Sequence, residues 1–312
     1  MTFDDLNSLG KKREPFLFIT DFKAQNIVVI PLDELHANNV EFCIDENYPI
    51  KTHLDFLEKH TLRFSEYKKK FDYVIEKIKA GDTYLLNLTQ PTLVKTSLTL
   101  KEIFECANAH YKLRYKDEFV CFSPEKFIQI KESKISTYPM KGTIDASIAN
   151  AKEIILGNKK EMAEHVMVVD LLRNDLSIVA KNVKVEKFRY ITEIEAGKKK
   201  LLHVSSHISG DLEDDWHSKI GDILSALLPA GSISGAPKKS TLDIIEEVEG
   251  YERGFFSGIF GVYDGKALDS AVMIRFIEKT KNGYMYKSGG GITLDSDVKS
   301  EYNELLDKVY LP

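Results

Sequence analysis

The sequence has few cysteines and contains no apolar stretch of the roughly 20 residues that a membrane helix needs. Its three cysteines, Cys43, Cys106 and Cys121, are scattered and form no Cys-x-x-Cys pair. A disulfide framework and a cysteine metal site are therefore disfavoured, and we interpret each cysteine as a small buried apolar residue. This pattern fits a reducing compartment and predicts a cytoplasmic protein.

An excess of basic residues is also absent, because 43 Lys and Arg stand against 48 Asp and Glu, for a net charge of −5. Nucleic acids and anionic membranes are bound through basic patches, so neither is expected as a partner. The acidic start, Met1-Thr2-Phe3-Asp4-Asp5, lacks the apolar core of a signal peptide. With 312 residues, 43% of them hydrophobic, the chain is long enough to bury a large core.

Strand-like and helix-like segments come in runs and do not alternate strictly. Apolar patterning predicts strands over residues 16–20, 27–30, 83–95, 120–122, 127–130, 134–138, 183–194, 201–209, 259–263 and 267–277. Helical periodicity predicts helices over residues 65–80, 98–110, 148–156, 159–179, 216–227, 238–248 and 296–309. Gly81 is expected to end the first of these helices. Such an order indicates an α+β fold with antiparallel sheets.

An acid and an amine are expected to meet through a predicted hairpin. Glu125 directly follows the strand that Ser123-Pro124 ends, and Lys141 follows the second strand of the hairpin formed by residues 127–138. The hairpin would return Lys141 to the neighbourhood of Glu125. A carboxylic acid beside an amine nucleophile suggests covalent chemistry on a poor leaving group. A surface ion pair is the alternative.

Glutamates recur with a spacing of three on two predicted helices. Glu161 and Glu164 share one helix face, and Glu301 and Glu304 share a face of the last helix. If the two pairs came together they would form an all-oxygen site suited to Mg²⁺, which keeps several waters and binds one or two carboxylates. Solvated helix faces are the alternative for each pair.

Two glycine-rich segments are candidate anion sites. Residues 231–237, Gly-Ser-Ile-Ser-Gly-Ala-Pro, precede a predicted helix, whose free N–H groups favour an anion. No Lys-Ser or Lys-Thr follows the second glycine, which excludes a phosphate loop of the Walker type. The run Gly289-Gly290-Gly291 is not a dinucleotide fingerprint, because the required third glycine falls on Leu294. Flexible turn glycines are the alternative for both segments.

Taken together, five motifs resemble those of the chorismate-utilising enzymes, which include anthranilate, isochorismate, salicylate and aminodeoxychorismate synthases. In chain order they are Tyr138–Ile144, Glu161–Asp175, Pro229–Lys238, Ser288–Asp297 and Glu301–Glu304. The resemblance runs from about Lys68 to the C-terminus and implies two orthogonally packed, mainly antiparallel sheets flanked by helices. Residues 63–312 would be the chorismate-binding catalytic domain, and residues 1–62 an abbreviated N-terminal part of the same fold.

The resemblance also implies roles for individual residues. Glu164 and Glu304 would hold Mg²⁺ and, through it, the ring carboxylate of chorismate, while Glu161 and Glu301 would support the metal. Substrate binding would fall to Gly235, Ala236, Gly289, Gly290, Gly291, Arg275, Lys308, Thr143 and His203. His203 would lie over the substrate ring, although a histidine on a strand of apolar residues is also typical of a core position.

One segment resembles a particular branch of this family. Pro139-Met140-Lys141-Gly142-Thr143 is similar to aminodeoxychorismate synthase component I, whereas the anthranilate and isochorismate enzymes usually carry alanine in place of Lys141. Leu85 stands where isochorismate-type enzymes place a water-activating lysine, which disfavours hydration at ring carbon C2. We therefore expect Lys141 to attack C2 while Glu125 protonates the departing 4-hydroxyl. Desolvation and nearby cations are expected to lower the pKa of Lys141.

The expected reaction makes 4-amino-4-deoxychorismate from chorismate and ammonia, for p-aminobenzoate and folate biosynthesis. None of the three cysteines lies in a nucleophile elbow, so a separate glutamine amidotransferase subunit is expected to supply the ammonia. Anthranilate synthase component I and isochorismate synthase remain alternatives. A non-catalytic relative that binds chorismate is a more remote one.

Overall fold

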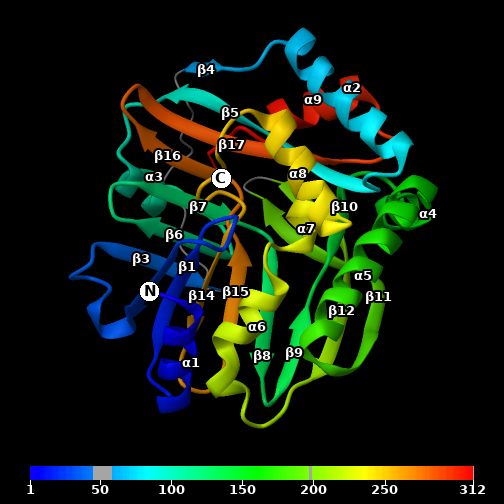
Figure 1. The fold of residues 1–312 in the computed structure, drawn as a ribbon. Helices are drawn as coiled ribbons and strands as arrows, with labels where there is room; N and C mark the ends of the chain where they lie inside the picture. The colour runs from blue at the N-terminus through cyan, green and yellow to red at the C-terminus, as the bar shows by residue number, and fades with distance from the viewer. Residues whose placement is uncertain (45–57, 197–198, 312) are drawn as a thin grey trace.

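Two antiparallel sheets form the centre of this computed structural model, which describes residues 1–44, 58–196 and 199–311. In Figure 1 the strands of one sheet run across those of the other, and helices lie on the outer sides of both. Every strand pair described is antiparallel. The α+β prediction with two sheets and flanking helices is confirmed.

The first sheet has the order β10-β12-β9-β8-β15-β14-β1-β2, and β11 pairs with β12. Its strands are β1 (Phe16–Thr20), β2 (Ile27–Pro31), β8 (Lys126–Lys131), β9 (Lys134–Thr137), β10 (Met140–Asp145), β11 (Lys181–Ala196), β12 (Lys199–Asp211), β14 (Ile259–Tyr263) and β15 (Leu268–Val272). The β8–β9 hairpin is the one expected from the sequence, and it leads the chain directly into β10, which carries Lys141.

The second sheet has the order β13-β5-β17-β16-β7-β6-β3, and β4 pairs with β5. Its strands are β3 (Val40–Ile44), β4 (Glu58–His60), β5 (Leu85–Lys95), β6 (Tyr111–Tyr115), β7 (Phe119–Ser123), β13 (Gly235–Ala236), β16 (Phe276–Thr280) and β17 (Gly283–Ile292). The long β5–β17 pair places Gly289, Gly290 and Gly291 opposite Thr89, Leu88 and Asn87.

Helices pack on the outer face of each sheet. The α-helices are α1 (Phe3–Lys12), α2 (Phe64–Ala80), α3 (Leu100–Cys106), α4 (Ala151–Gly157), α5 (Lys159–Val179), α6 (Ile220–Leu227), α7 (Gly231–Ser234), α8 (Lys238–Glu249) and α9 (Val298–Asp307), with 3-10 turns η1 (Leu32–Glu34) and η2 (Trp216–Lys219). Apolar clusters join α1, α5 and α6 to the first sheet, and α2, α8 and α9 to the second. Among the described residues, no helix combines the length and apolar character needed to span a membrane.

The two sheets meet through one apolar layer. Leu17 and Ile19 of β1 point into this layer with Phe260 of β14, and meet Leu113 and Phe119 from the second sheet. The alternate residues of β1, Phe16 and Phe18, point to the opposite face and pack in the cluster of the outer helices. All five residues of β1 are buried, as expected for a strand that is covered on both faces.

Three sequence predictions are corrected by the structure. The helix expected over 98–110 ends at Cys106, and the chain turns into β6 at Tyr111. The strand expected over 267–277 divides into β15 and β16, which belong to different sheets. Residues 273–275 make the crossing, and Arg275 has a φ of 51°, a left-handed conformation that breaks the strand. The alternative interpretation of Gly289-Gly290-Gly291 as flexible turn glycines is wrong, because all three belong to strand β17.

The N-terminal residues contribute directly to the first sheet. Strand β1 lies between β14 and β2, and helix α1, which the sequence patterns missed, packs against η2 and α6. The predicted N-terminal part, residues 1–62, includes residues 45–57, which lie outside the described residues. The boundary at residue 62 stays a prediction. Gly81, with a φ of 83°, caps the C-terminus of α2 as expected.

The layer between the sheets should dominate stability. Leu17→Ala should lower the free energy of unfolding by about 2–5 kcal/mol, because it opens a cavity in a fully buried layer. Ile178→Ala is the control, because Ile178 is 62% exposed and should change stability by no more than about 0.5 kcal/mol. Urea denaturation followed by fluorescence measures both. Equal losses in the two variants would contradict this description of the core.

Candidate active site

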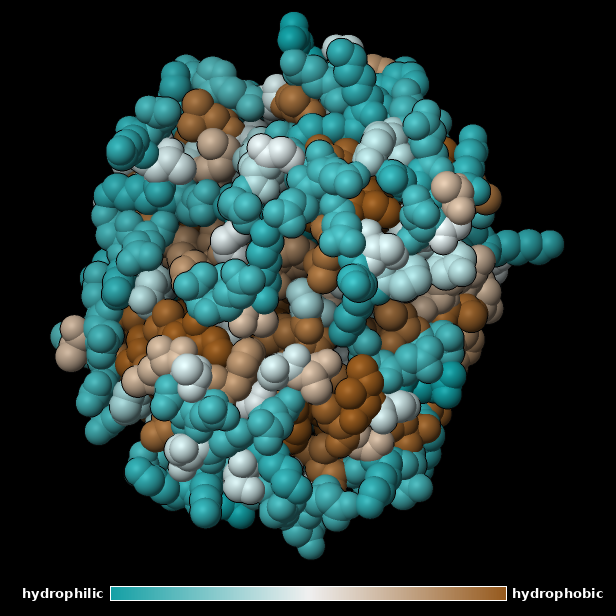
Figure 2. All heavy atoms as spheres, viewed as in Figure 1, coloured by the Kyte–Doolittle hydropathy of each residue, from teal (hydrophilic) through white to brown (hydrophobic). Residues whose placement is uncertain are grey.

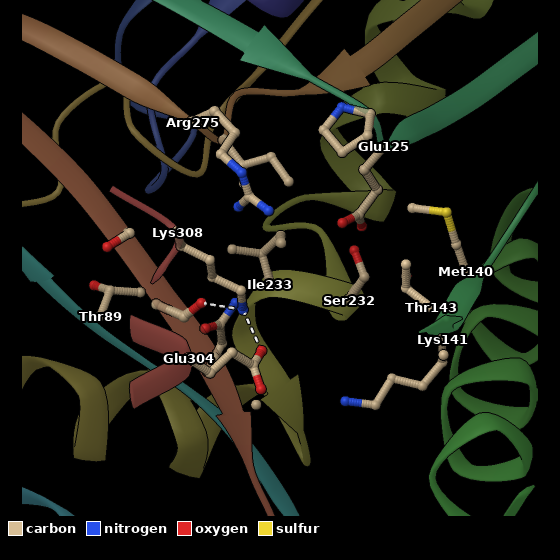
Figure 3. A pocket seen from close by; sticks show the side chains of 18 of the residues that line it. Thr89, Glu125, Met140, Lys141, Thr143, Ser232, Ile233, Arg275, Glu304 and Lys308 are labelled. Atoms are coloured by element: carbon tan, nitrogen blue, oxygen red, sulfur yellow. Dashed lines mark hydrogen bonds and ion pairs between the residues drawn. The ribbon is translucent and has the colours of Figure 1, made fainter. Parts of the chain in front are cut away.

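A cavity of about 450 Å³ lies where ends of both sheets meet, within the size range of small-molecule sites. Its walls come from β5, β10, β17, α5, α7, α9 and the crossing at Arg275 (Figure 3). The residues predicted from the sequence that line it are Glu125, Lys141, Thr143, Glu161, Arg275, Gly289, Gly290, Gly291, Glu304 and Lys308. Segments that are far apart in the chain therefore supply one common site.

Glu125 faces the cavity beside Ser232 of α7 (Figure 3). Burial raises the pKa of the Glu125 carboxyl, while a hydrogen bond with Ser232 and the charges of Arg275 and Lys308 lower it; the net pKa lies above the usual value. Its backbone N–H donates to Ser123 Oγ at 3.0 Å and its carbonyl accepts from Val272 N–H at 3.1 Å. Glu125 is thus an acid held in place and disposed to keep its proton.

Lys141 reaches into the same cavity from β10 and pairs with a carboxylate of α5. Its Nζ lies 2.7 Å from Glu164 Oε2, and the Glu164 side chain is only 12% exposed. Desolvation lowers the pKa of Lys141, but Glu164, with Glu161 and Glu304 also nearby, raises it by more, and the net pKa lies above its usual value. The expectation of a lowered pKa is therefore wrong for this arrangement, because carboxylates and not cations surround the amine.

The four predicted glutamates gather around Lys141 from two helices. Glu301 Oε2 and Glu304 Oε1 would lie 3.4 Å and 3.7 Å from a Cβ atom placed on Gly290. Glu161 Oε2 is buried and has no hydrogen-bond partner within the described residues. Glu161 lines the large cavity, and Glu164 lines a smaller cavity beside it. Glu301 lines neither cavity and accepts a hydrogen bond from Ser296 Oγ at 2.8 Å.

The oxygen donors of this cluster suit a hard cation that also keeps waters or binds substrate oxygens. Within residues 1–44, 58–196 and 199–311, no three acidic, histidine or cysteine side chains form a ready-made metal cage. Glu164 and Glu304 are paired with lysines, at 2.7 Å to Lys141 and 2.6 Å to Lys308. The unpartnered oxygen of Glu161 and the all-carboxylate donor set nevertheless fit Mg²⁺ better than a thiolate- or imidazole-seeking metal.

The wall of the cavity opposite Lys141 is cationic (Figure 3). Lys308 donates to the Gly289 carbonyl at 2.7 Å and pairs with Glu304; desolvation lowers its pKa, although Glu304 opposes this. Arg275 points into the cavity, and its Nε is buried without a partner in the described part of the chain. A guanidinium with unused donors is suited to a planar carboxylate.

Two glycines allow close backbone approaches at the site. A Cβ at Gly235, which has a φ of 123°, would lie 1.9 Å from the Leu85 carbonyl oxygen. A Cβ at Gly289 would lie 2.5 Å from the Leu88 carbonyl oxygen. Larger residues would push β13 and β17 away from β5. The glycine motifs therefore serve partly to bring three strands together beside the cavity.

Three predicted residues lie at or beyond the margin of the large cavity. Thr143 lines it, and its hydroxyl is 3.4 Å from His203 Nδ1. His203, on β12, lines neither cavity, and its Nδ1 is 2.7 Å from the Met140 sulfur. Ala236 also lines neither; its carbonyl accepts from Tyr84 N–H at 2.8 Å and Thr83 Oγ1 at 3.0 Å. Substrate contact by His203 and Ala236 stays a prediction.

A smaller cavity of about 100 Å³ adjoins the large one. Both are lined by Asn87, Glu125, Met140, Lys141, Ser232 and Gly291. The smaller cavity also reaches Glu164, Gly235 and Thr293, and has an apolar wall made of Leu85, Pro139, Met140, Met167 and Val168. Met167 is 38% exposed, so this wall extends to the surface at α5.

Sequence patterns did not predict the roles of Asn87, Ser232 and Thr293. Asn87 Oδ1 and Thr293 Oγ1 are buried without hydrogen-bond partners in the described residues, and both line the smaller cavity. Asn87 belongs to β5 and Thr293 follows β17, so their meeting depends on strand pairing. The glycine-rich pattern of residues 231–237 points to backbone N–H groups, yet the hydroxyl of Ser232 hydrogen-bonds to Glu125. Nothing in the sequence around Ser232 indicates that Glu125 is its partner.

Comparisons with known proteins point to one family. A model described as chorismate binding enzyme matches residues 35–311. An uncharacterized PabA-like protein of Haemophilus influenzae is 48% identical over 99% of this chain and 95% of its own. Aminodeoxychorismate synthase component 1 of Bacillus subtilis is 33% identical over 99% of this chain and 68% of its own. The protein of the same name from Salmonella typhimurium is 35% identical over 78% of this chain and 56% of its own.

Solved structures share the fold. The menaquinone-specific isochorismate synthase of Escherichia coli superimposes with a TM-score of 0.74 at 16% identity, covering 97% of this chain and 79% of its own. Anthranilate synthase component I of Streptococcus pneumoniae gives a TM-score of 0.70 at 25% identity, covering 83% and 60%. At 16% identity, the likeness to the isochorismate synthase establishes the architecture alone.

A buried ion pair between Arg253 and Glu249 supports the part of β5 that lines the cavity. Arg253 Nε donates to Glu249 Oε2 at 2.8 Å, and both side chains are almost fully buried. Arg253 Nη2 also donates to the Asn87 carbonyl at 2.7 Å, while Glu249 Oε1 accepts from Thr89 N–H at 2.8 Å. The pair thus ties α8 to the part of β5 that lines the cavity.

Removing one member of this pair should be costly. Arg253→Met should lower the free energy of unfolding by about 3–5 kcal/mol, because it leaves the Glu249 charge buried without a counter-charge. Glu249→Gln in the same chain should restore part of that loss, since glutamine keeps an acceptor for Thr89 but carries no charge. Denaturant titration of both variants makes the comparison. A double variant less stable than Arg253→Met would contradict this account.

Proposed function

Because the chain belongs to the chorismate-binding enzyme family, we propose that it is an aminodeoxychorismate synthase component I, which replaces the 4-hydroxyl of chorismate with an amino group. The observation that carries the proposal is the arrangement of Lys141 and Glu125. The Lys141 amine and the Glu125 carboxyl, which is disposed to keep its proton, line the same cavity. The opposite wall of this cavity is cationic and suits a dicarboxylate.

Chorismate, a dianion, would be held between the two charged sides of the cavity. Arg275 and Lys308 would receive carboxylate groups, with the backbone at Gly289–Gly291 close to the ligand. Glu164 and Glu304, supported by Glu161 and Glu301, would hold Mg²⁺, which would offset the repulsion between these acids and a substrate carboxylate.

Glu125 is the proposed general acid. Hydroxide is a poor leaving group, so the C4–O bond breaks more easily when a proton arrives as it stretches. The raised pKa of Glu125 keeps that proton available, and the Ser232 hydroxyl orients the carboxyl. After the transfer, the 4-hydroxyl leaves as water and Glu125 is a carboxylate.

Lys141 is the proposed nucleophile, and it must first lose both its proton and its ion pair with Glu164. Its neutral amine forms a bond to C2 while both conjugated ring double bonds shift and the C4–O bond breaks. Ammonia then bonds to C4, both double bonds shift back, and the C2–N bond to Lys141 breaks. The proton lost by the new C4 ammonium returns Glu125 to its acid form, so the sum is chorismate plus ammonia giving aminodeoxychorismate plus water.

The ammonia would come from a separate glutamine amidotransferase. The chain shows no nucleophile elbow around Cys43, Cys106 or Cys121 in its sequence. Relatives named as component 1 of aminodeoxychorismate synthase agree with a division of labour between two subunits. This partner is part of the proposal.

Incubation with chorismate, Mg²⁺ and an ammonium salt should give aminodeoxychorismate without release of pyruvate, because Lys141 directs substitution at the ring and no elimination is required. Separation by liquid chromatography and mass spectrometry identifies the product. Glutamine in place of ammonium should give no product until an amidotransferase is added. Anthranilate, salicylate or isochorismate as the main product would refute the proposed activity.

Glu164→Gln and Glu304→Gln should each reduce turnover by at least about a hundredfold and raise the Mg²⁺ concentration needed for half-maximal rate, because each removes one anionic oxygen donor. Asp170→Asn is the matched control, since Asp170 is an exposed acid of α5 that pairs with Arg173. Initial rates measured over a range of Mg²⁺ concentrations distinguish the two glutamate variants from the control variant. Unchanged metal dependence in both glutamate variants would place the metal elsewhere.

Lys141 should become covalently attached to chorismate when ammonia is withheld, because the nucleophile of the second step is then missing. Intact-protein mass spectrometry should show the mass of chorismate less water, mapped to the peptide that contains Lys141. Lys141→Ala and Glu125→Gln should both lose the adduct, whereas Lys239→Ala should keep it, since Lys239 is an exposed lysine of α8 that lines neither cavity. Amination by Lys141→Ala at the wild-type rate would exclude the covalent route.

A further inference from the structure

We propose that Asp175 and Lys238 are positioning residues for the proposed acid Glu125, on which their ion pair acts through Ser232. The inference rests on the proposed function, because it assigns a part in breaking the C4–O bond to two residues that line neither cavity. Lys238 Nζ lies 3.1 Å from Asp175 Oδ1, and the Lys238 and Asp175 side chains are 24% and 11% exposed. Any contribution of this pair to the reaction is therefore indirect.

Lys238 closes the loop that carries Ser232. This loop, residues 228–237, connects α6 to α8 and contains α7 and β13. Lys238 is the first residue of α8, and its Nζ donates to the carbonyl of Leu227, the last residue of α6, at 2.8 Å. One side chain thus joins the two ends of the loop, and Asp175 of α5 holds that side chain in place.

The Asp175 carboxylate also lies against the residue that precedes Ser232. A Cβ atom on Gly231, the first residue of α7, would lie 2.6 Å from Asp175 Oδ2 and 3.3 Å from Leu171 Cδ2. Helix α5 therefore packs directly on the start of α7, and glycine leaves the room that the carboxylate occupies. Because Ser232 is the next residue in the chain, the place of its side chain depends on this contact.

The other side of α7 is held by the second sheet and α8. The carbonyl of Ile233 accepts from Arg253 Nη1 at 3.4 Å, and Arg253 also pairs with Glu249 of α8. Gly235, which follows α7, is paired with Leu86 of β5. Helix α7 is thus held between β5 on one side and α5 on the other, and the ion pair supplies the charged contact on the α5 side.

Ser232 carries this placement to Glu125. Its hydroxyl lies beside the Glu125 carboxyl in the cavity (Figure 3). Burial raises the pKa of Glu125, and the hydrogen bond with Ser232 opposes that rise, so this bond favours the carboxylate form. In the proposed mechanism the carboxylate forms as the C4–O bond breaks. A well-placed Ser232 would therefore speed that step and leave the binding of chorismate unchanged.

Lys239, the next residue of α8, provides a matched control. It is exposed, and so are Asp243, Glu246 and Glu247, so charged side chains make up the outer face of this helix. Figure 2 shows mostly hydrophilic side chains over this part of the molecule. Substitution of Lys238 and of Lys239 by methionine therefore distinguishes loss of the ion pair from loss of a positive charge on α8.

The test measures the loss of the 4-hydroxyl from chorismate in the full chain with Mg²⁺, as the Lys141 adduct without ammonia and as aminated product with it. Ser232→Ala should slow both about tenfold to a hundredfold, as expected for one hydrogen bond to a charged group. Lys238→Met and Asp175→Ala should each slow them about tenfold, whereas Lys239→Met should match the wild type. The KM for chorismate should stay unchanged in every variant.

A double-mutant cycle tests whether the ion pair acts through Ser232. Lys238→Met added to Ser232→Ala should cause no further slowing, because the side chain that the pair positions is already lost. Asp175→Asn combined with Lys238→Met removes both charges and leaves no unpaired buried carboxylate. This neutral pair should be about tenfold slow as well, and it keeps the test available if a single variant does not fold.

The outcomes separate this inference from the proposed function. A wild-type chain that does not aminate chorismate would reject the proposed function. A wild-type chain that aminates, with Lys238→Met, Asp175→Ala and the neutral pair reacting at its rate, would overturn the positioning role alone. Slowing that adds to that of Ser232→Ala would also overturn it, because the pair would then act independently of Ser232. A rise in the KM for chorismate in place of slowing would do the same.

Discussion

The ion pair between Lys141 and Glu164 is the interaction on which the site depends. A primary amine enters a cavity lined with carboxylates, and at 2.7 Å from Glu164 it is held in its charged form. The same contact places the amine at the junction of the two cavities. The proposed nucleophile would thus be stored as an ammonium, and its release would depend on what else Glu164 binds, so that substrate and metal binding would prepare Lys141 for attack.

The ion pair forms within the first-sheet layer, where α5 packs on β10, and the crossing of the two sheets brings the other charged groups of the site to it. Lys141 arrives on β10 of the first sheet. Glu304 arrives on α9, which packs against the second sheet, and Lys308 is the C-cap residue of that helix. Arg275 lies at the point where the chain passes from β15 in one sheet to β16 in the other, in a left-handed conformation. Strained backbone of this kind is often found at functional sites, where the surrounding structure compensates for its cost.

Much of the fold and site could be predicted from local patterns, and the failures have a common cause. Strand alternation and the Ser123-Pro124 break correctly indicated that Glu125 and Lys141 serve one cavity. The i, i+3 spacing indicated the acidic helix faces of α5 and α9. The pKa of Lys141 was misjudged because the sequence does not tell which charges lie nearest in space. Asn87 and Thr293 were missed because their importance comes from buried, unpartnered oxygens, which only long-range packing of β5 and β17 creates.

The central claim is that a protein amine, and not water, attacks the ring. Turnover of chorismate with ammonium in water enriched in ¹⁸O tests it most directly, with the oxygen content of every ring product read by mass spectrometry. The account predicts that no product carries ¹⁸O on the ring, because Lys141 occupies C2 and ammonia takes C4. Incorporation of ¹⁸O at C2 would contradict it and would make water the nucleophile.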